Sequence, residues 1–169
     1  SAQAALPVLS KCVPAAFQSD VNLLKQVVYT MIKLTLQYGN DQNSSFAYVM
    51  YGLLLSADPQ TVERGYRFGE LGLKLLEKYK AKAIECRVKH IFNSHIRFTK
   101  DPIREAIEPM KDALNTGLVT GDLEFVSYIS NVRCLNILFS NSNLNNIFSE
   151  YILLNYIGLH LHLLIKTKI

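Results

Sequence analysis

Helix-start signals recur along this chain at a nearly constant interval, and this regularity limits the fold to a few architectures. One set of starts has a capping Asp or Asn and is spaced by 43 and about 42 residues, at Asp58, Asp101 and about Asn143. The other set is spaced by 39 and 40 residues, at about Asn43, Lys82 and Asp122. Pro59 and Pro102 follow the first two signals, at the helical position where a missing N–H costs nothing. The pattern predicts a helix–turn–helix unit that repeats about every 40 residues.

Apolar residues between these signals recur at helical spacing, and no segment shows the alternation that is typical of a strand. The predicted helices cover about 20–38, 43–56, 58–79, 82–98, 101–119, 122–139 and 144–166. Gly39 and Gly121 suit helix ends, where a left-handed residue is common. We therefore expect an all-α fold, a tetratricopeptide-like α-solenoid of antiparallel helix pairs with about three repeats of ~40 residues.

The domain organisation is inferred from the chain length and from the helix-boundary signals. A chain of 169 residues suits one ordinary domain, so 1–169 is interpreted as a single helical-repeat domain. Within it, 1–19 is a lead segment, 20–140 holds the repeats and 141–169 is a terminal helix. Because the chain begins with Ser1 rather than Met, we interpret it as a fragment of a larger protein.

Three glycines in the predicted helix 58–79 lie on one of its faces. Gly65, Gly69 and Gly72 occupy positions i, i+4 and i+7, and each interior Gly costs about 1 kcal/mol relative to Ala. Their retention on one face predicts that another helix backbone approaches closely there. Gly52 and Ala47 in the preceding helix are the expected facing residues.

The cysteines and the longest uncharged run bear on the compartment. Cys12, Cys86 and Cys134 are widely spaced and form no CxxC pair, which favours a reducing, cytoplasmic location with each cysteine as a small buried residue. From Tyr151 to Ile165 the chain has no formal charge, but a membrane span needs about 20 apolar residues. We expect a buried helix there and no membrane contact.

The sequence contains no phosphate-binding loop, metal-ligand motif or nucleophile motif, so we expect no catalytic residue, no cofactor and no metal in this chain. The histidines are His90, His95, His160 and His162. His90 and His95 are five positions apart and therefore share an α-helical face poorly. Cys86 and His90 are four apart, and a catalytic pair formed by them stays open as an alternative.

The net charge of +4 comes from a local basic cluster. Its members lie around one predicted helix–helix corner and are Lys78, Lys80, Lys82, Arg87 and Lys89. We interpret this cluster as a solvated corner that could contact a partner. Nucleic acid is a disfavoured partner, because Tyr79 is the only aromatic residue among the lysines.

Three runs resemble consecutive segments of one family of large multidomain signalling proteins: Leu36–Ser56, Gly65–Ile96 and Glu108–Asn131. In that family, of cyanobacterial and fungal type, a protein-kinase-like domain and an AAA/STAND-type ATPase precede a tetratricopeptide-like helical-repeat region. GAF and histidine-kinase modules follow it. The resemblance covers about residues 20–140, and the family's catalytic motifs belong to the other modules.

The resemblance implies a non-catalytic regulatory scaffold in a two-component signal-transduction protein. The implied partners are the flanking ATPase, GAF and histidine-kinase modules or a separate signalling protein. Exposed apolar ends of such a stack would also favour self-association. The alternatives are a free-standing tetratricopeptide-like adaptor that binds peptides, and a small helical ligand-binding domain or enzyme.

Overall fold

The described part of the chain is all-helical. The computed structural model describes residues 5–140 and Ile152, and within that part it contains α-helices and short π- and 3-10 turns but no strand. The α-helices are α1 (Ala5–Ser19), α2 (Val21–Tyr38), α3 (Ser44–Ser56), α4 (Val62–Lys78), α5 (Lys82–Ile91), α6 (Ile107–Thr120) and α7 (Leu123–Phe139). The predicted last helix, 144–166, lies outside the described residues apart from Ile152.

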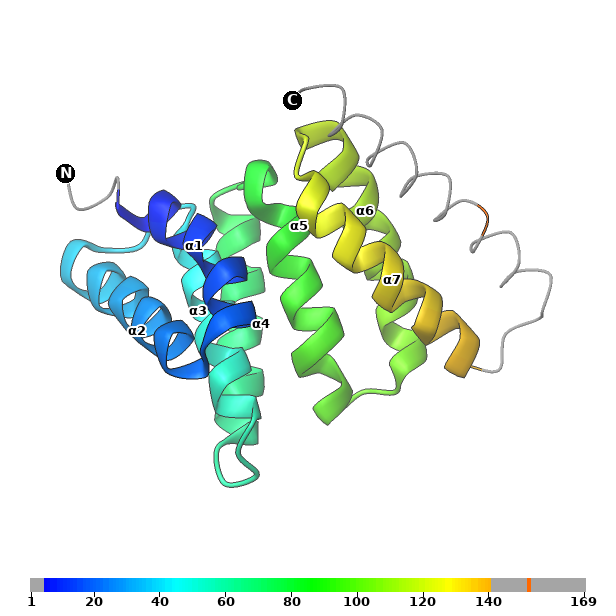
Figure 1. Cartoon of the computed structure of the whole chain (residues 1–169), viewed down its shortest axis with the longest axis horizontal. Coiled ribbons are helices and arrows are strands. Elements are labelled where there is room, and N and C mark those ends of the chain that lie inside the picture. The colour runs from blue at the N-terminus through cyan, green and yellow to red at the C-terminus, as the bar shows by residue number, and fades with distance from the viewer. Residues whose placement is uncertain (1–4, 141–151, 153–169) are drawn as a thin grey trace.

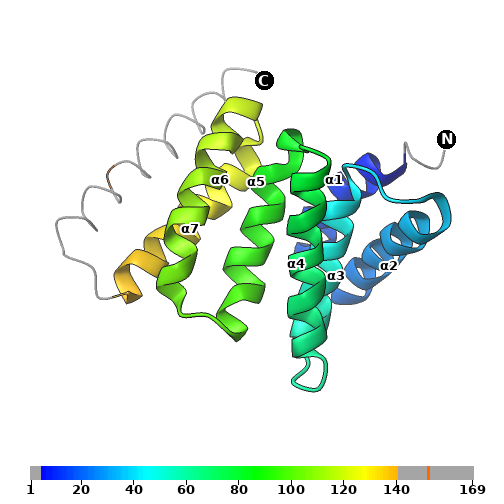
Figure 2. The same cartoon turned by 180° about the vertical axis from the view of Figure 1, so that it is seen from behind.

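The helices stand in a row, and each packs mainly against its neighbours in the chain. The strongest contacts join α3 to α4, α1 to α2, α5 to α6 and α6 to α7. Figures 1 and 2 show α1 and α2 at one end of the row, α6 and α7 at the other, and α3, α4 and α5 between them. No helix in the described part is both long and apolar enough to cross a bilayer.

Of the two N-terminal helices, α2 was predicted and α1 was not. The lead segment 1–19 received no predicted element, yet residues 5–19 form α1, with Pro14 inside the helix. This helix persists because its apolar face is buried against α2 and α3 through Leu6, Val13 and Ala16. By contrast, α2 begins as predicted, since the carboxylate of Asp20 accepts a hydrogen bond of 2.8 Å from the N–H of Asn22.

Two predicted helix starts are displaced toward the C-terminus. Asp58 accepts a hydrogen bond from the Gln60 N–H at 2.9 Å and shapes a turn, so α4 begins only at Val62. A 3-10 turn, Ile103–Ala106, precedes α6, because Asp101 does not cap a helix. Its carboxylate instead accepts hydrogen bonds from the Tyr66 hydroxyl at 3.0 Å and from Arg97 Nε at 3.1 Å.

The predicted helix end at Gly121 is confirmed, but the predicted cap at Asp122 is wrong. Gly121 has φ +76° in the left-handed region, and the N–H of Asp122 donates to the carbonyl of Gly117 at 3.0 Å. Asp122 precedes α7, yet its side chain makes no capping hydrogen bond. The carboxylate binds Arg87 instead, as described below.

The predicted helix 82–98 is not a uniform α-helix. After α5 ends at Ile91, residues Phe92–Ile96 form a π turn, and residues Arg97–Thr99 form a 3-10 turn. A π turn has i→i+5 hydrogen bonds and is often found at functional sites. This local change of period has direct consequences for the two histidines on this segment.

The α3 and α4 backbones meet at the glycines. A Cβ built on Gly52 would lie 2.7 Å from the carbonyl oxygen of Gly65, and one built on Gly72 would lie 2.8 Å from the carbonyl oxygen of Ser45. Gly69 faces elsewhere, because a Cβ there would lie 2.7 Å from the ring of Phe92 in the π turn. The glycine face therefore admits both α3 and the π turn.

The cysteines have different environments, although all three were expected to be buried. Cys86 is fully buried, Cys134 is half-buried and Cys12 is exposed. Cys12 is exposed because it lies on the outer face of α1, away from the buried residues Val13 and Ala16.

Candidate functional site

The π turn brings His90 and His95 together. Their ring centroids are 5.5 Å apart with the planes at 85°. The expectation that residues five positions apart share a face poorly holds for an α-helix, but i→i+5 hydrogen bonding widens the turn and aligns the two positions. The sequence signal for this change is weak, because it depends on Phe92 packing into the space beside Gly69.

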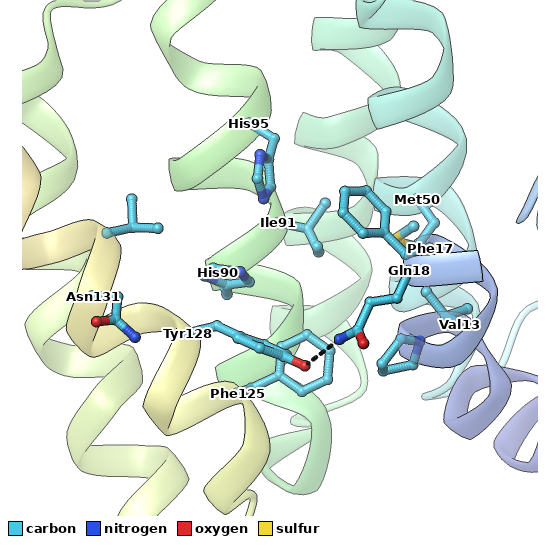
Figure 3. Close-up of a pocket in the computed structure, with 12 residues that line it drawn as sticks. Val13, Phe17, Gln18, Met50, His90, Ile91, His95, Phe125, Tyr128 and Asn131 are labelled. Atoms are coloured by element: carbon cyan, nitrogen blue, oxygen red, sulfur yellow. Dashed lines mark hydrogen bonds between the residues drawn. The ribbon is translucent and has the colours of Figure 1, made fainter. Parts of the chain in front are cut away.

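Both imidazoles line a pocket of about 290 Å³ between α1 on one side and α5 and α7 on the other. Its walls are mostly apolar and aromatic and consist of Val13, Pro14, Phe17, Gln18, Met50, His90, Ile91, His95, Phe125, Tyr128, Asn131 and Val132. Figure 3 shows Phe17 and Gln18 extending from α1 across the pocket, with Gln18 reaching Tyr128 of α7.

The two imidazoles are uncharged at neutral pH. Burial lowers the pKa of His90 to about 3, and the neighbouring His95 contributes to the same shift. Burial also lowers the pKa of His95. A neutral imidazole has one nitrogen that donates and one that accepts, so each ring can form hydrogen bonds of both kinds.

Aromatic rings surround the histidines. The His90 ring is stacked on Tyr128 at 5.9 Å and meets the edge of Phe125 at 5.8 Å, while Phe17 lies 6.4 Å from His95. The hydroxyl of Tyr128 accepts a hydrogen bond of 3.3 Å from Gln18 Nε2, and this bond, drawn in Figure 3, bridges α1 and α7. The pocket therefore offers flat, uncharged surfaces with a few hydrogen-bonding groups.

The surroundings of Cys86 are those of a packing residue rather than of a reactive thiol. Its side chain is fully buried, and a Cβ built on Gly117 would lie 2.5 Å from its Sγ atom. Burial raises the pKa of the Cys86 thiol to about 12, so the thiolate is not populated at neutral pH. The hydrogen-bond partner of His90 Nδ1 is Ser94 Oγ at 3.0 Å. Cys86 is a packing residue between α5 and α6.

The predicted basic cluster divides into two groups. Lys78, Lys80 and Lys82 are exposed at the corner between α4 and α5. Lys89 forms an ion pair with Glu85 one turn away on α5. Arg87 points into the protein, so only the three exposed lysines present free positive charge at this corner.

Arg87 joins three helices. Its Nη2 donates to Asp122 Oδ1 at 2.8 Å and its Nε donates to Asp122 Oδ2 at 3.0 Å, which makes a two-point ion pair. Its Nη1 donates to Ser10 Oγ on α1 at 3.2 Å. The guanidinium also lies 5.0 Å from the ring centroid of Phe125 and 5.8 Å from that of Phe46. Arg87 is therefore a structural residue.

Two open grooves lie on the outside of the row. The α2 groove has a volume of about 470 Å³ and is formed by Tyr29, Ile32, Lys33, Leu36, Gln37 and Tyr51. Leu36 is 72% exposed there and Tyr29 is 52% exposed, so the groove presents apolar surface to solvent. A second groove of about 500 Å³ runs along α4, α5 and α6 and includes Lys80 and Lys82.

Apolar side chains are also exposed at the opposite end of the row. They belong to α6 and α7 and are Leu118, Val119, Leu135, Leu138 and Phe139. Within the described part of the chain, no group of three His, Cys, Asp or Glu side chains is placed to hold a metal ion. His160 and His162 lie outside the described residues.

Comparison with known proteins gives one curated relative. The chain is 24% identical over 127 residues to hybrid signal transduction histidine kinase G of Dictyostelium discoideum. The match covers 74% of this chain but only 4% of the length of that kinase. No family model matches the chain. No solved structure matches it either.

Proposed function

We propose that this chain is a non-catalytic helical-repeat segment of a larger signal-transduction protein, in which it holds neighbouring domains in a defined arrangement. The similarity to a small part of a hybrid histidine kinase supports the signalling context. The relevant partners are then the ATPase, GAF or histidine-kinase modules that flank such a segment, or a separate signalling protein, in the cytoplasm.

The arrangement of the helices supports a solenoid. The starts of α3, α5 and α7 at Ser44, Lys82 and Leu123 are 38 and 41 residues apart, and each helix packs mainly on its neighbours. In such a stack every unit buries its apolar stripe against the next unit. The two ends therefore expose apolar surface until another segment or protein covers them. We infer that α3 to α7 are successive helix pairs of this kind.

The exposed apolar face of α2 is the observation that carries the proposal. Tyr29 and Leu36 lie in the α2 groove beside Tyr51, whose ring meets that of Tyr29 at 6.2 Å. Lys33 also lines this groove. An amphipathic helix from the adjoining segment, with an acidic residue near Lys33, would complete it.

The environment of Cys86 supports a non-catalytic role over the enzyme alternative. A thiol that is fully buried and has a pKa of about 12 is a poor nucleophile. The imidazole that could activate it is bonded to Ser94 instead.

The test uses the natural full-length protein that contains this chain. Leu36→Lys would place a charge in the α2 groove, and we expect histidine autophosphorylation to change by about fivefold or more. Thr30→Lys is the matched control, because it adds the same charge to an exposed position of α2 outside the groove. It should leave phosphorylation unchanged.

The isolated chain provides a second measurement. Sedimentation should reveal association that increases with concentration and is weakened by Leu36→Lys but not by Thr30→Lys. Equal phosphorylation in all three full-length proteins, or ATP turnover by the isolated chain that a substitution abolishes, would contradict the proposal.

The groove along α4, α5 and α6 favours one alternative, a peptide-binding adaptor. Lys80 and Lys82 are exposed at its edge, while Phe92 contributes an apolar floor. An acidic peptide suits this combination of charge and apolar surface. Peptide display on the isolated chain should then enrich acidic sequences whose binding is lost in Lys80→Glu/Lys82→Glu and retained in Leu36→Lys.

A further inference from the structure

The pocket lined by His90 and His95 lies at the seam between the N-terminal helix pair and the rest of the row. α1 contributes Phe17 and Gln18 to one wall, and the α5 side contributes the two imidazoles to the other. The bond between Gln18 and Tyr128 and the bond between Arg87 and Ser10 cross this seam. A molecule held in the pocket would therefore touch α1, α5 and α7 at once.

Two imidazoles in the pocket keep unused hydrogen-bonding capacity. His90 is only 4% exposed, and its partner among the described residues is Ser94, which engages Nδ1 and leaves Nε2 available. His95 has no hydrogen-bond partner in the described part of the chain. Both rings line the pocket, so a ligand held there could form hydrogen bonds with these nitrogens.

We propose that this pocket binds a small, flat, uncharged aromatic molecule that carries one hydroxyl or ring N–H. The rings of Phe17, Phe125, Tyr128 and the histidines provide faces and edges for stacking on such a molecule. An imidazole nitrogen of His90 or His95 receives or donates the single hydrogen bond that fixes its orientation.

The size of the pocket sets the size of the ligand. An apolar cavity of about 150 Å³ is sufficient for benzene. The pocket of about 290 Å³ is roughly twice as large, which suits two fused rings.

The charge state of the pocket excludes ionic ligands. None of the twelve residues that line it is Asp, Glu, Lys or Arg. Both imidazoles are neutral at pH 7, because burial lowers their pKa values. An anion or cation would lose its hydration without gaining a counter-charge, whereas a neutral aromatic molecule would not.

Binding can be measured directly with 2-naphthol, because the chain contains no Trp and has little competing fluorescence. The complete 169-residue chain should produce a saturable change in 2-naphthol fluorescence with one site. Val132→Phe would fill part of the pocket and should weaken binding by about tenfold or more. Leu36→Ala changes the α2 groove instead and should leave the affinity unchanged.

The hydrogen bond is tested by changing the ligand in the unaltered protein. Naphthalene should bind about five times more weakly than 2-naphthol, and the anion 2-naphthoate should not bind. In His95→Leu or His90→Leu the preference for the hydroxyl should fall to less than about twofold in at least one variant. Helical circular dichroism checks that each variant is folded.

Three results would overturn the inference. They are 2-naphthol binding that does not saturate, binding that folded Val132→Phe leaves intact, and equal affinities of the unaltered chain for 2-naphthol, naphthalene and 2-naphthoate. None of them bears on the proposed scaffold role, which is tested through Leu36 and histidine phosphorylation.

Discussion

Loss of the Arg87 guanidinium should destabilise this protein more than loss of any other positive charge at the α4–α5 corner. In Arg87→Met an uncharged side chain replaces the guanidinium that lies beside the rings of Phe46 and Phe125. Asp122, whose side chain is only 8% exposed, is then left as a buried carboxylate without its two-point partner. Breaking a buried pair in this way typically costs about 3–5 kcal/mol of unfolding free energy.

A double-mutant cycle separates the pair from its surroundings. Arg87→Met and Asp122→Asn should each lower the unfolding free energy, measured by urea denaturation and circular dichroism. The double variant removes both charges, so its loss should be smaller than the sum of the single losses by about 1–3 kcal/mol. Lys82→Met, an exposed change in the same helix, should alter the free energy by less than about 0.5 kcal/mol.

The geometry of the pair also predicts a local effect. Arg87 is the residue that connects Ser10 of α1 to Asp122 at the start of α7, so hydrogen exchange should become faster in α1 of Arg87→Met. A cost below about 1 kcal/mol for Arg87→Met, or strictly additive single losses, would refute the reasoning.

Three further predictions concern packing and titration. Gly52→Ala should lower the unfolding free energy by about 1–3 kcal/mol despite the better helix propensity of Ala, because its Cβ would meet the Gly65 carbonyl. Lowering the pH from 7 to 5 should cost about 2 kcal/mol, since the pKa of His90 is about 3 when folded against 6.5 when unfolded. A disulfide reagent should label Cys12 quickly in the folded protein and Cys86 only after unfolding.

Each of these predictions has a control. Asn115→Ala, on the exposed face of α6, should change stability by less than about 0.5 kcal/mol, and an equal loss in Gly52→Ala and Asn115→Ala would contradict the steric argument. As the pH falls, histidine takes up a proton in the unfolded chain before it does so in the folded protein. The contribution of neutral His90 to the unfolding free energy is therefore complete above pH 6.5 and falls below it. His95 acts in the same direction. A folded His90→Phe variant should therefore depend less on pH. Labelling of Cys86 at the rate of Cys12 would show that α5 and α6 open easily.

The elements that follow from local signals were predicted well. Asp20 caps α2, and Gly121 ends α6, because both depend only on residues within one helical turn. The contact between Gly52 and Gly65 could also be predicted from sequence, because interior glycines on the facing sides of adjacent helices indicate close backbone approach. The histidine-kinase resemblance agrees with the relative found by comparison in its signalling context, although not in the finer architecture.

The features that depend on distant residues could not be predicted. Arg87 and Asp122 are 35 positions apart, so the sequence did not show that they form a buried ion pair. Arg87 was therefore interpreted as an exposed charge. Asp122 itself resembled a helix cap, and only its competition for Arg87 changes that assignment. α1 was missed because Pro14 argues against a helix, while the buried contacts that hold it come from other helices.

The π turn at Phe92–Ile96 determines more than the position of one ring. Each residue of an α-helix turns the chain by about 100°, so if these same residues took regular α-helical hydrogen bonds, everything beyond them would be rotated about the helix axis. His95 would then swing out of the seam, and α6 and α7 would begin from a different direction. The π turn thus couples the lining of the pocket to the direction in which α6 and α7 begin. A change in one would alter the other.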